Sequence, residues 1–141
     1  MRTVSFILLL TVLFFDIAAC KKGKDRPAAI QRYGMVTGIR PDKIARYEQL
    51  HAAVWPGVLK MIKECNIQNY SIYLQKIDSA YFLFSYFEYT GADFNGDMKK
   101  MAEDSMTRRW WEETDPTQLP LPEAAGQKKI WTNMKEVFHT N

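Results

Sequence analysis

Residues 80–89 read AYFLFSYFEY, the most strand-like stretch of this 141-residue chain. Aromatic and large aliphatic side chains favour strands because they pack well on a pleated surface. Successive side chains of a strand point to opposite faces of the sheet, and here both faces are apolar. We therefore expect both faces of this strand to be covered. The two sets are Phe82, Phe84 and Tyr86 on one face, and Tyr81, Leu83 and Phe87 on the other.

Three further strands are predicted around this one. Residues 67–75 (IQNYSIYLQ) alternate, with Tyr70, Ile72 and Leu74 on one face, and residues 76–79 form the hairpin connection. Residues 33–39 place Met35, Thr37 and Ile39 on one face, and residues 129–138 form the last strand. The segment 115–126, rich in proline, is expected to be a loop.

Helical spacing fills the gaps between these strands. Residues 42–54 carry apolar side chains three and four apart, Trp55-Pro56-Gly57 interrupts them, and residues 58–64 continue as a shorter helix. Asp93 is expected to cap a following helix, and Ser105 to cap a helix that contains Trp110 and Trp111.

The order of elements is therefore β-α-β-β-α-β. This is the split β-α-β, or ferredoxin-like, pattern of the α+β class: a four-stranded antiparallel sheet with helices on one face. The opposite face of such a sheet would expose Phe and Tyr to water, and a large apolar patch marks an interface. We expect two copies to pack sheet against sheet, giving a homodimer and a dimeric α/β barrel.

The N-terminus has the pattern of a targeting segment. Residues 4–15 (VSFILLLTVLFF) are almost wholly apolar but shorter than the roughly 20 residues that span a bilayer. Ile17-Ala18-Ala19-Cys20 then resembles a bacterial lipobox. We predict a lipoprotein signal at 1–19, a lipidated Cys20 with a tether over 20–29, and one domain over 30–141. The protein would be an exported, membrane-anchored lipoprotein of the periplasm or cell surface; the alternative is an ordinary signal peptide with an incidental Cys.

Charge and cysteine content exclude several classes of function. Residues 1–30 account for the whole formal net charge of +3, so the domain is neutral and lacks the footprint of nucleic-acid binding. The two His residues have no carboxylate spaced to join them, so the sequence predicts no zinc site. Beyond Cys20 there is only Cys65, so no internal disulfide is possible.

Four features of the domain could carry chemistry. Tyr47 and His51 are four residues apart and so share a helix face. Trp55-Pro56 follows them, Asn69-Tyr70 opens a strand, and Trp110-Trp111 is a rare aromatic pair. Taken alone, a helical His is more often a surface or core residue than a catalytic one, and paired Trp residues more often serve packing. The residues by themselves leave these alternatives open.

The same features resemble a known family. The segment 47–56 (YEQLHAAVWP) is similar to the Y-x-x-x-H-x-x-x-W-P signature of the L-rhamnose mutarotases. Residues 69–74 (NYSIYL), the Trp110-Trp111 pair and residues 134–139 (MKEVFH) are similar to further blocks of that family, in the same order. The resemblance covers residues 31–139 and implies an isomerase that interconverts the α and β anomers of a deoxyhexose, most closely L-rhamnose.

Carried over by position, the resemblance implies roles for five residues. His51 is expected to be the proton donor, and Tyr47, Tyr70, Trp110 and Trp111 are expected to bind the sugar. It also implies a dimeric barrel with no metal and no organic cofactor. A His with an ordinary pKa near 6.5 suits this reaction, because it can give and take protons near neutrality. Two rival functions remain open: a monooxygenase or haem-degrading enzyme on the same barrel, and a non-catalytic sugar-binding lipoprotein.

Overall fold

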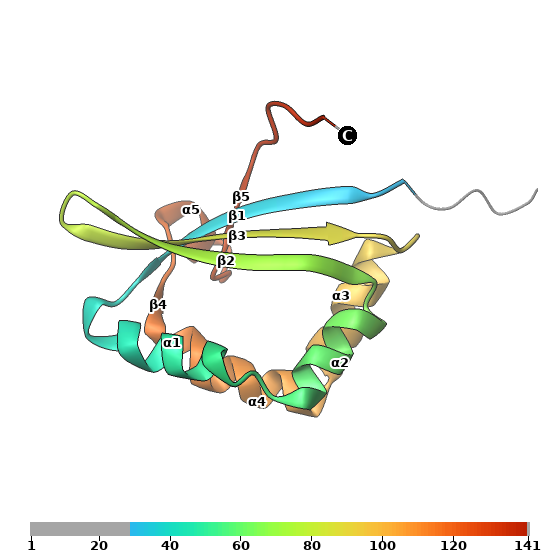
Figure 1. Cartoon of the computed structure of the whole chain (residues 1–141), viewed down its shortest axis with the longest axis horizontal. Coiled ribbons are helices and arrows are strands. Elements are labelled where there is room, and N and C mark those ends of the chain that lie inside the picture. The colour runs from blue at the N-terminus through green and yellow to red at the C-terminus, as the bar shows by residue number, and fades with distance from the viewer. Residues whose placement is uncertain (1–28, 141) are drawn as a thin grey trace, which may run out of the picture.

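The computed structural model describes residues 29–140, which form one α+β unit (Figure 1). The elements follow in the order β1 (Gln31–Ile39), η1 (Pro41–Lys43), α1 (Ile44–Ala52), α2 (Pro56–Glu64), β2 (Ile67–Ile77), β3 (Ala80–Tyr89), α3 (Phe94–Glu103), α4 (Ser105–Thr114), η2 (Asp115–Thr117), β4 (Gln118–Leu119), α5 (Pro122–Gly126) and β5 (Thr132–Met134).

The strands form a single antiparallel sheet in the order β2-β3-β1-β4, and β5 pairs with β1 beside β4. Helices α1 to α4 lie together on one face of this sheet (Figure 1). The predicted fold class, an antiparallel sheet with helices on one face in the ferredoxin-like order, is confirmed. The strand over residues 80–89 has the predicted bounds and lies between β2 and β1 in the sheet.

The two faces of β3 have different surroundings. Leu83, Ser85 and Phe87 are buried beneath the helices, whereas Phe82, Phe84 and Tyr86 are only partly buried on the opposite side. The register places more apolar residues on that opposite side, among them Tyr73 of β2, whose side chain is 63% exposed. We call this the outer sheet face, and it consists of Val36, Tyr73, Phe82, Phe84, Tyr86, Leu119 and Met134.

The last predicted strand, over residues 129–138, is mostly wrong. Only Thr132–Met134 pair with β1, because β4, inside the predicted loop 115–126, takes the other part of that edge. The close approach of β4 depends on Gly38: a Cβ there would lie 2.8 Å from the Leu119 carbonyl oxygen. After Met134 the chain leaves the sheet on the side away from the helices (Figure 1), with Val137 and Phe138 90% and 81% exposed.

One predicted helix cap is confirmed and one is wrong. The Asp93 side chain accepts a hydrogen bond from the Gly96 N–H at 3.0 Å, as expected of a cap on α3. The cap of α4 is Asp104, not Ser105: its carboxylate accepts from the Thr107 N–H at 2.7 Å. Asp104 lies in extended backbone directly after α3, which leaves its side chain free to turn back onto the next helix.

Three buried clusters lie between the sheet and the helices. One joins Ile39, Tyr47 and Leu83, and a second joins Leu50, Val58 and Trp110, so the residues of the predicted site are also part of the core. Cys65 is a free, buried thiol whose S–H donates to the Met61 Sδ at 3.6 Å, in keeping with a small buried hydrophobic residue.

Candidate active site

All five residues predicted for the sugar site line one cavity of about 1030 Å³ between the sheet and the helices. Tyr47 and His51 reach it from α1, Tyr70 from β2, and Trp110 and Trp111 from α4. Tyr47 and His51 are one helical turn apart, as the spacing predicted, and their rings stack with centroids 4.0 Å apart. The structure thus brings together residues that are up to 64 positions apart in the sequence.

His51 is held by a hydrogen bond from its own helix. Its Nδ1 lies 2.9 Å from the Tyr47 carbonyl oxygen. A carbonyl oxygen can only accept, so Nδ1 carries the proton and Nε2 is the nitrogen left for a bound molecule. Burial lowers the pKa of His51 below its usual value, against the opposite effect of this backbone hydrogen bond. The imidazole therefore changes its protonation at Nε2, below pH 6.5.

Two tyrosine hydroxyl groups face the same space. Burial raises the pKa of Tyr47 far above its ordinary value, with a smaller contribution from Tyr70. Burial also raises the pKa of Tyr70 to about 12, although 40% of the residue's surface is exposed. Both hydroxyl groups are protonated at neutral pH, as tyrosines ordinarily are, and can donate hydrogen bonds to a ligand.

A β-bulge places Tyr70 in the cavity. The register between β2 and β3 shifts between Gln68 and Ser71, and Asn69 has a φ of 51° in the left-handed region. The Glu88 carboxylate accepts hydrogen bonds from the side-chain amides of Gln68 and Asn69, at 2.9 and 2.8 Å. The extra residue lets Tyr70 join the buried face, where it meets the ring of Phe87 edge-on.

The two tryptophans have different surroundings. Trp110 is only 6% exposed, packs against Leu50 and Val58, and meets the ring of His51 edge-on with centroids 5.3 Å apart. Trp111 is half-buried and presents more surface to the cavity. Trp110 therefore serves the core and the cavity together, which combines the two interpretations that the sequence left open.

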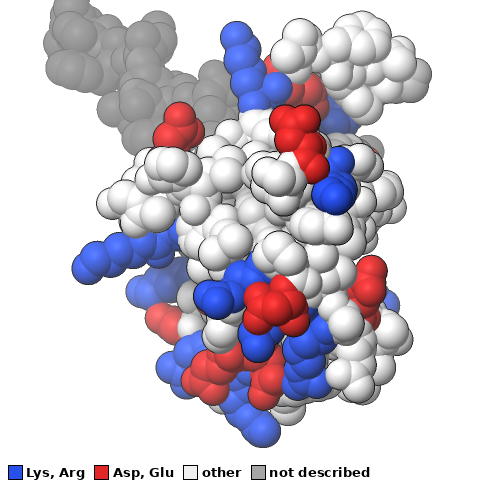
Figure 2. Space-filling model, turned by 90° about the vertical axis from the view of Figure 1, so that its left-hand side faces the viewer, with Lys and Arg blue, Asp and Glu red and all other residues white. Residues whose placement is uncertain are grey.

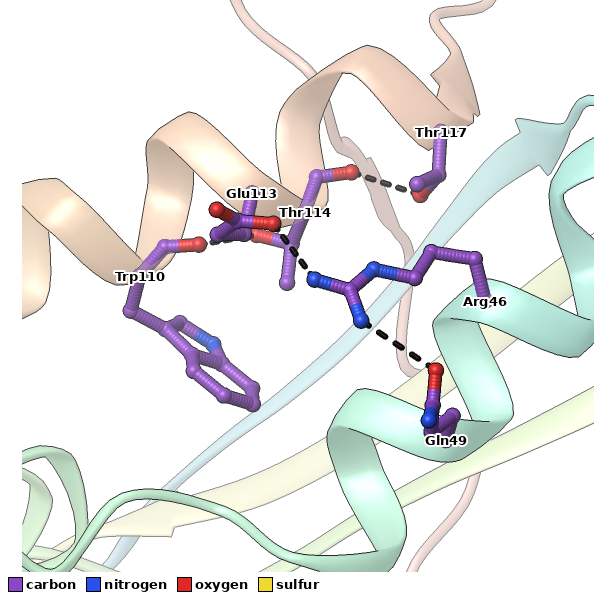
Figure 3. Close-up of polar contacts among 6 residues, drawn as sticks. All are labelled: Arg46, Gln49, Trp110, Glu113, Thr114 and Thr117. Carbon is purple, nitrogen blue, oxygen red and sulfur yellow. Dashed lines mark hydrogen bonds and ion pairs between the residues drawn. The ribbon is translucent and has the colours of Figure 1, made fainter.

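Polar contacts fix α1 against α4 (Figure 3). The Arg46 guanidinium of α1 donates to the Glu113 carboxylate at 2.7 Å and to Gln49 Oε1 at 3.2 Å. In the same view two threonine side chains, one of α4 and one of η2, pair with carbonyl groups at the end of α4: Thr114 donates to the Trp110 carbonyl at 3.1 Å, and Thr117 to the Thr114 carbonyl at 2.6 Å. The Arg46–Glu113 ion pair thus joins, on their exposed side, the two helices that carry four of the five predicted residues.

Several wall residues were not predicted from the sequence. They include Asp115, Gln118, Trp131 and Thr132, which come from the turn after α4 and from the segment around β5. One signal was available for Asp115, which lies four residues after Trp111 and so on the same helix face. Gln118, Trp131 and Thr132 offer no such signal, because only the pairing of β4 and β5 with β1 brings them to the cavity.

The charged side chains and the lining of the cavity indicate which kind of ligand the site can bind. No cluster of three or more His, Cys, Asp or Glu side chains suited to a metal occurs within residues 29–140. On the side of the molecule seen in Figure 2, acidic and basic side chains alternate over the helical layer, without a patch of one sign. The cavity itself combines aromatic faces with a few polar groups, which is the composition of a small-molecule site.

Fold and cavity together define a small ferredoxin-like α+β protein with an aromatic site sized for a small polar molecule. Comparison with known proteins identifies the group. A family model described as L-rhamnose mutarotase matches residues 32–140. The chain therefore belongs to the L-rhamnose mutarotase family, and the resemblance seen in the sequence is confirmed. The enzyme class expected from it, an isomerase that acts at the anomeric carbon of a sugar, is confirmed with it.

Individual relatives agree with the family match. An L-rhamnose mutarotase of Oceanobacillus iheyensis is 31% identical over 110 residues, covering 78% of this chain and 98% of the relative. One from Lactiplantibacillus plantarum is 28% identical, covering 77% and 96%. The crystal structure of an L-rhamnose mutarotase from Formosa agariphila shares the fold with a TM-score of 0.58 at 19% identity, covering 79% of this chain and 99% of that one. The rival haem-degrading and lipoprotein functions gain no support from these matches.

The predicted localisation is contradicted by the same comparisons. The matched relatives are named L-rhamnose mutarotases, and this chain covers 96–98% of their length. The similarity therefore points to the mutarotase enzyme and gives no support to a lipoprotein. Because these relatives are metabolic L-rhamnose mutarotases, we withdraw the prediction of an exported, membrane-anchored lipoprotein. No helix within residues 29–140 is long and apolar enough to cross a bilayer. The predicted signal segment 1–19 and Cys20 lie outside the described residues.

Proposed function

We propose that this chain accelerates the exchange between the α and β anomers of L-rhamnose, with His51 as the proton donor in ring opening. The observation that carries the proposal is the fixed imidazole in the aromatic cavity. The Tyr47 carbonyl holds Nδ1 at 2.9 Å, so proton exchange with a bound molecule is confined to Nε2. A group that can both give and take a proton at one defined atom is what a reversible ring opening requires.

The reaction breaks and remakes one bond of the sugar. His51, when protonated, gives the proton on Nε2 to the ring oxygen while a base takes the proton of the anomeric hydroxyl. The bond between the anomeric carbon and the ring oxygen breaks, the aldehyde end rotates, and the ring closes on its other face as both protons return. Acid–base help of this kind contributes about 10²- to 10⁴-fold in rate.

The aromatic residues supply binding and orientation. Trp110 and Trp111, which both line the cavity, offer apolar aromatic surfaces against which the C–H face and methyl group of a 6-deoxy sugar can pack. The hydroxyl groups of Tyr47 and Tyr70 are protonated at neutral pH, and their raised pKa values keep them so in alkaline solution as well; they donate hydrogen bonds to sugar oxygens. Tyr47 has a second role, since its backbone carbonyl orients His51.

The same proposal includes a homodimer formed through the outer sheet face. The helices cover only one side of the sheet, and the other side carries Phe82, Phe84 and Tyr73 with part of their surface open. A row of partly exposed aromatic side chains on a flat sheet is typical of an interface between subunits. Two copies related by a two-fold axis would cover each other's sheets and form the predicted barrel.

The test is an exchange measurement on the purified protein. Saturation-difference NMR of the anomeric protons reports the exchange rate directly, with L-rhamnose as the main substrate and L-fucose and D-glucose for comparison. We expect faster exchange of L-rhamnose than in protein-free buffer. If the protein binds the sugars but accelerates none of them, the enzyme proposal fails and a sugar-binding function takes its place.

A further inference from the structure

We infer that Asp115 is the base that works with His51 at the anomeric carbon; this inference rests on the proposed function and names the missing partner of that reaction. Asp115 follows the last residue of α4, and its backbone N–H donates to the Trp111 carbonyl. It therefore lies one turn beyond Trp111 on the same helix face. It lines the same cavity as His51 and the two tyrosines.

The surroundings of the carboxyl group are unusual for a structural aspartate. Asp115 is half-buried, and among the described residues its side chain makes no hydrogen bond and no ion pair. Burial raises the pKa of Asp115 above its usual value. Placing a carboxylate in a cavity wall without a partner costs stability, so such groups are concentrated at functional sites.

Gln118 gives a second, independent sign that a polar ligand occupies this end of the cavity. Its side chain is almost fully buried, at 7% exposure, and its Nε2 donates to the Thr114 carbonyl at 3.3 Å. This contact shows which amide atom of Gln118 is the nitrogen, because an amide oxygen could not hydrogen-bond to the Thr114 carbonyl oxygen. The remaining atom, Oε1, is buried and has no partner among the described residues. It is an acceptor suited to a sugar hydroxyl.

Most buried polar atoms in proteins have a hydrogen-bond partner. An unpaired buried acceptor in the wall of an aromatic cavity therefore indicates a ligand with hydroxyl groups, and Asp115 lies three residues before Gln118 in the same wall.

The assignment completes the proton balance of ring opening. The Asp115 carboxylate takes the proton of the anomeric hydroxyl, whose electron pair forms the carbonyl as the bond to the ring oxygen breaks. His51 gives its Nε2 proton to that ring oxygen. On closure from the other face, the neutral His51 takes the proton back and the Asp115 carboxyl returns its own. Nothing is oxidised, no other reactant is consumed, and the enzyme ends in its starting protonation state.

The other charged groups of the wall fit this role less well. Glu123 and Lys129 also line the cavity, but both side chains are exposed. An exposed group keeps its hydration shell and gains little from the low polarity of the site. Glu112 and Glu113, on the same helix as Trp111, do not line the cavity, and Glu113 is engaged with Arg46 at 2.7 Å.

The experiment compares wild type with Asp115→Asn and a matched control, Glu112→Gln, which removes one carboxylate from the exposed side of α4. For L-rhamnose, we expect kcat to fall at least about 100-fold in Asp115→Asn while KM changes only a few-fold, because the base acts in the transition state. Glu112→Gln should keep both constants. Asp115→Ala should regain part of its activity with added formate, which supplies a carboxylate.

Thermal unfolding adds a readout that distinguishes a catalytic from a structural role. An unpaired carboxylate kept for catalysis costs stability, so Asp115→Asn should unfold at the same temperature as wild type or higher. A variant that unfolds earlier, or one that keeps the wild-type kcat, overturns the assignment. If wild type itself exchanges no sugar, the proposed function fails and takes the assignment with it; an active wild type with an equally active Asp115→Asn removes the assignment alone.

Discussion

Replacement of His51 by Ala should abolish catalysis and leave the fold in place. Loss of one general acid costs about 10²- to 10⁴-fold in rate, which is roughly 3–5 kcal/mol of transition-state stabilisation. The cost in folding is smaller. The imidazole is half-buried, makes one hydrogen bond to the Tyr47 carbonyl, and contacts the rings of Tyr47 and Trp110.

Those contacts give the size of the stability effect. A hydrogen bond contributes about 1 kcal/mol and an aromatic contact about 0.5–1.5 kcal/mol. Because part of the ring is exposed, we expect a loss of about 2 kcal/mol in the free energy of unfolding. A domain of this size is stable by about 5–15 kcal/mol. The variant should therefore remain folded at 25 °C while its exchange rate falls by orders of magnitude.

The assay is anomeric exchange of L-rhamnose by NMR, with circular dichroism to follow unfolding. His51→Gln provides a variant that cannot carry a proton, and His139→Ala is the matched control at the other histidine of the chain. Added imidazole should restore part of the rate of His51→Ala but not that of His51→Gln, whose side chain fills the space. A folded His51→Ala that exchanges the sugar as fast as wild type would refute the assignment of His51 as the acid.

Three further predictions concern stability and assembly. Because burial lowers the pKa of His51 in the folded state, the unfolded chain binds the proton more readily. The free energy of unfolding should therefore fall as the pH drops through and below about 6.5. If urea titrations show that the free energy of unfolding of His51→Gln depends on pH as steeply as that of wild type, this would count against the prediction. Trp110→Ala should lose about 3–5 kcal/mol of stability because the indole is part of the buried core. Trp111→Ala, in contrast, should raise KM more than it lowers kcat. Equal melting temperatures for the two variants would contradict this distinction between the two residues. Wild type should have twice the chain mass in light scattering, and Phe84→Glu on the outer sheet face should be monomeric; a wild-type monomer at micromolar concentration would sink the dimer.

The sequence determined the parts of this protein that depend on local pattern. The run of aromatic and aliphatic residues over 80–89 predicted the bounds of β3, and the spacing of Tyr47 and His51 placed both on one face of α1. The face of the sheet that Tyr70 takes was also predicted correctly. That prediction assumed simple alternation along the strand and did not include the bulge at Asn69. Periodicity reports which face a residue takes, because the backbone geometry of a strand or helix repeats over a few residues.

Tertiary structure decided what depends on pairing between distant segments. Residues 129–138 have the composition of a strand, yet only three of them pair with β1. β4 occupies the other part of the same edge, where Leu119 approaches Gly38 closely. The same pairing brings Gln118, Trp131 and Thr132 to the cavity. It also leaves Asp115 at a helix end without a polar partner within the described residues, a property of its surroundings that no spacing along the chain could reveal. Burial and hydrogen-bond partners are set by which segments meet in space. His51 could therefore be proposed as the acid from the resemblance of a local motif to a known family, whereas Asp115 is inferred as the base only from the folded chain.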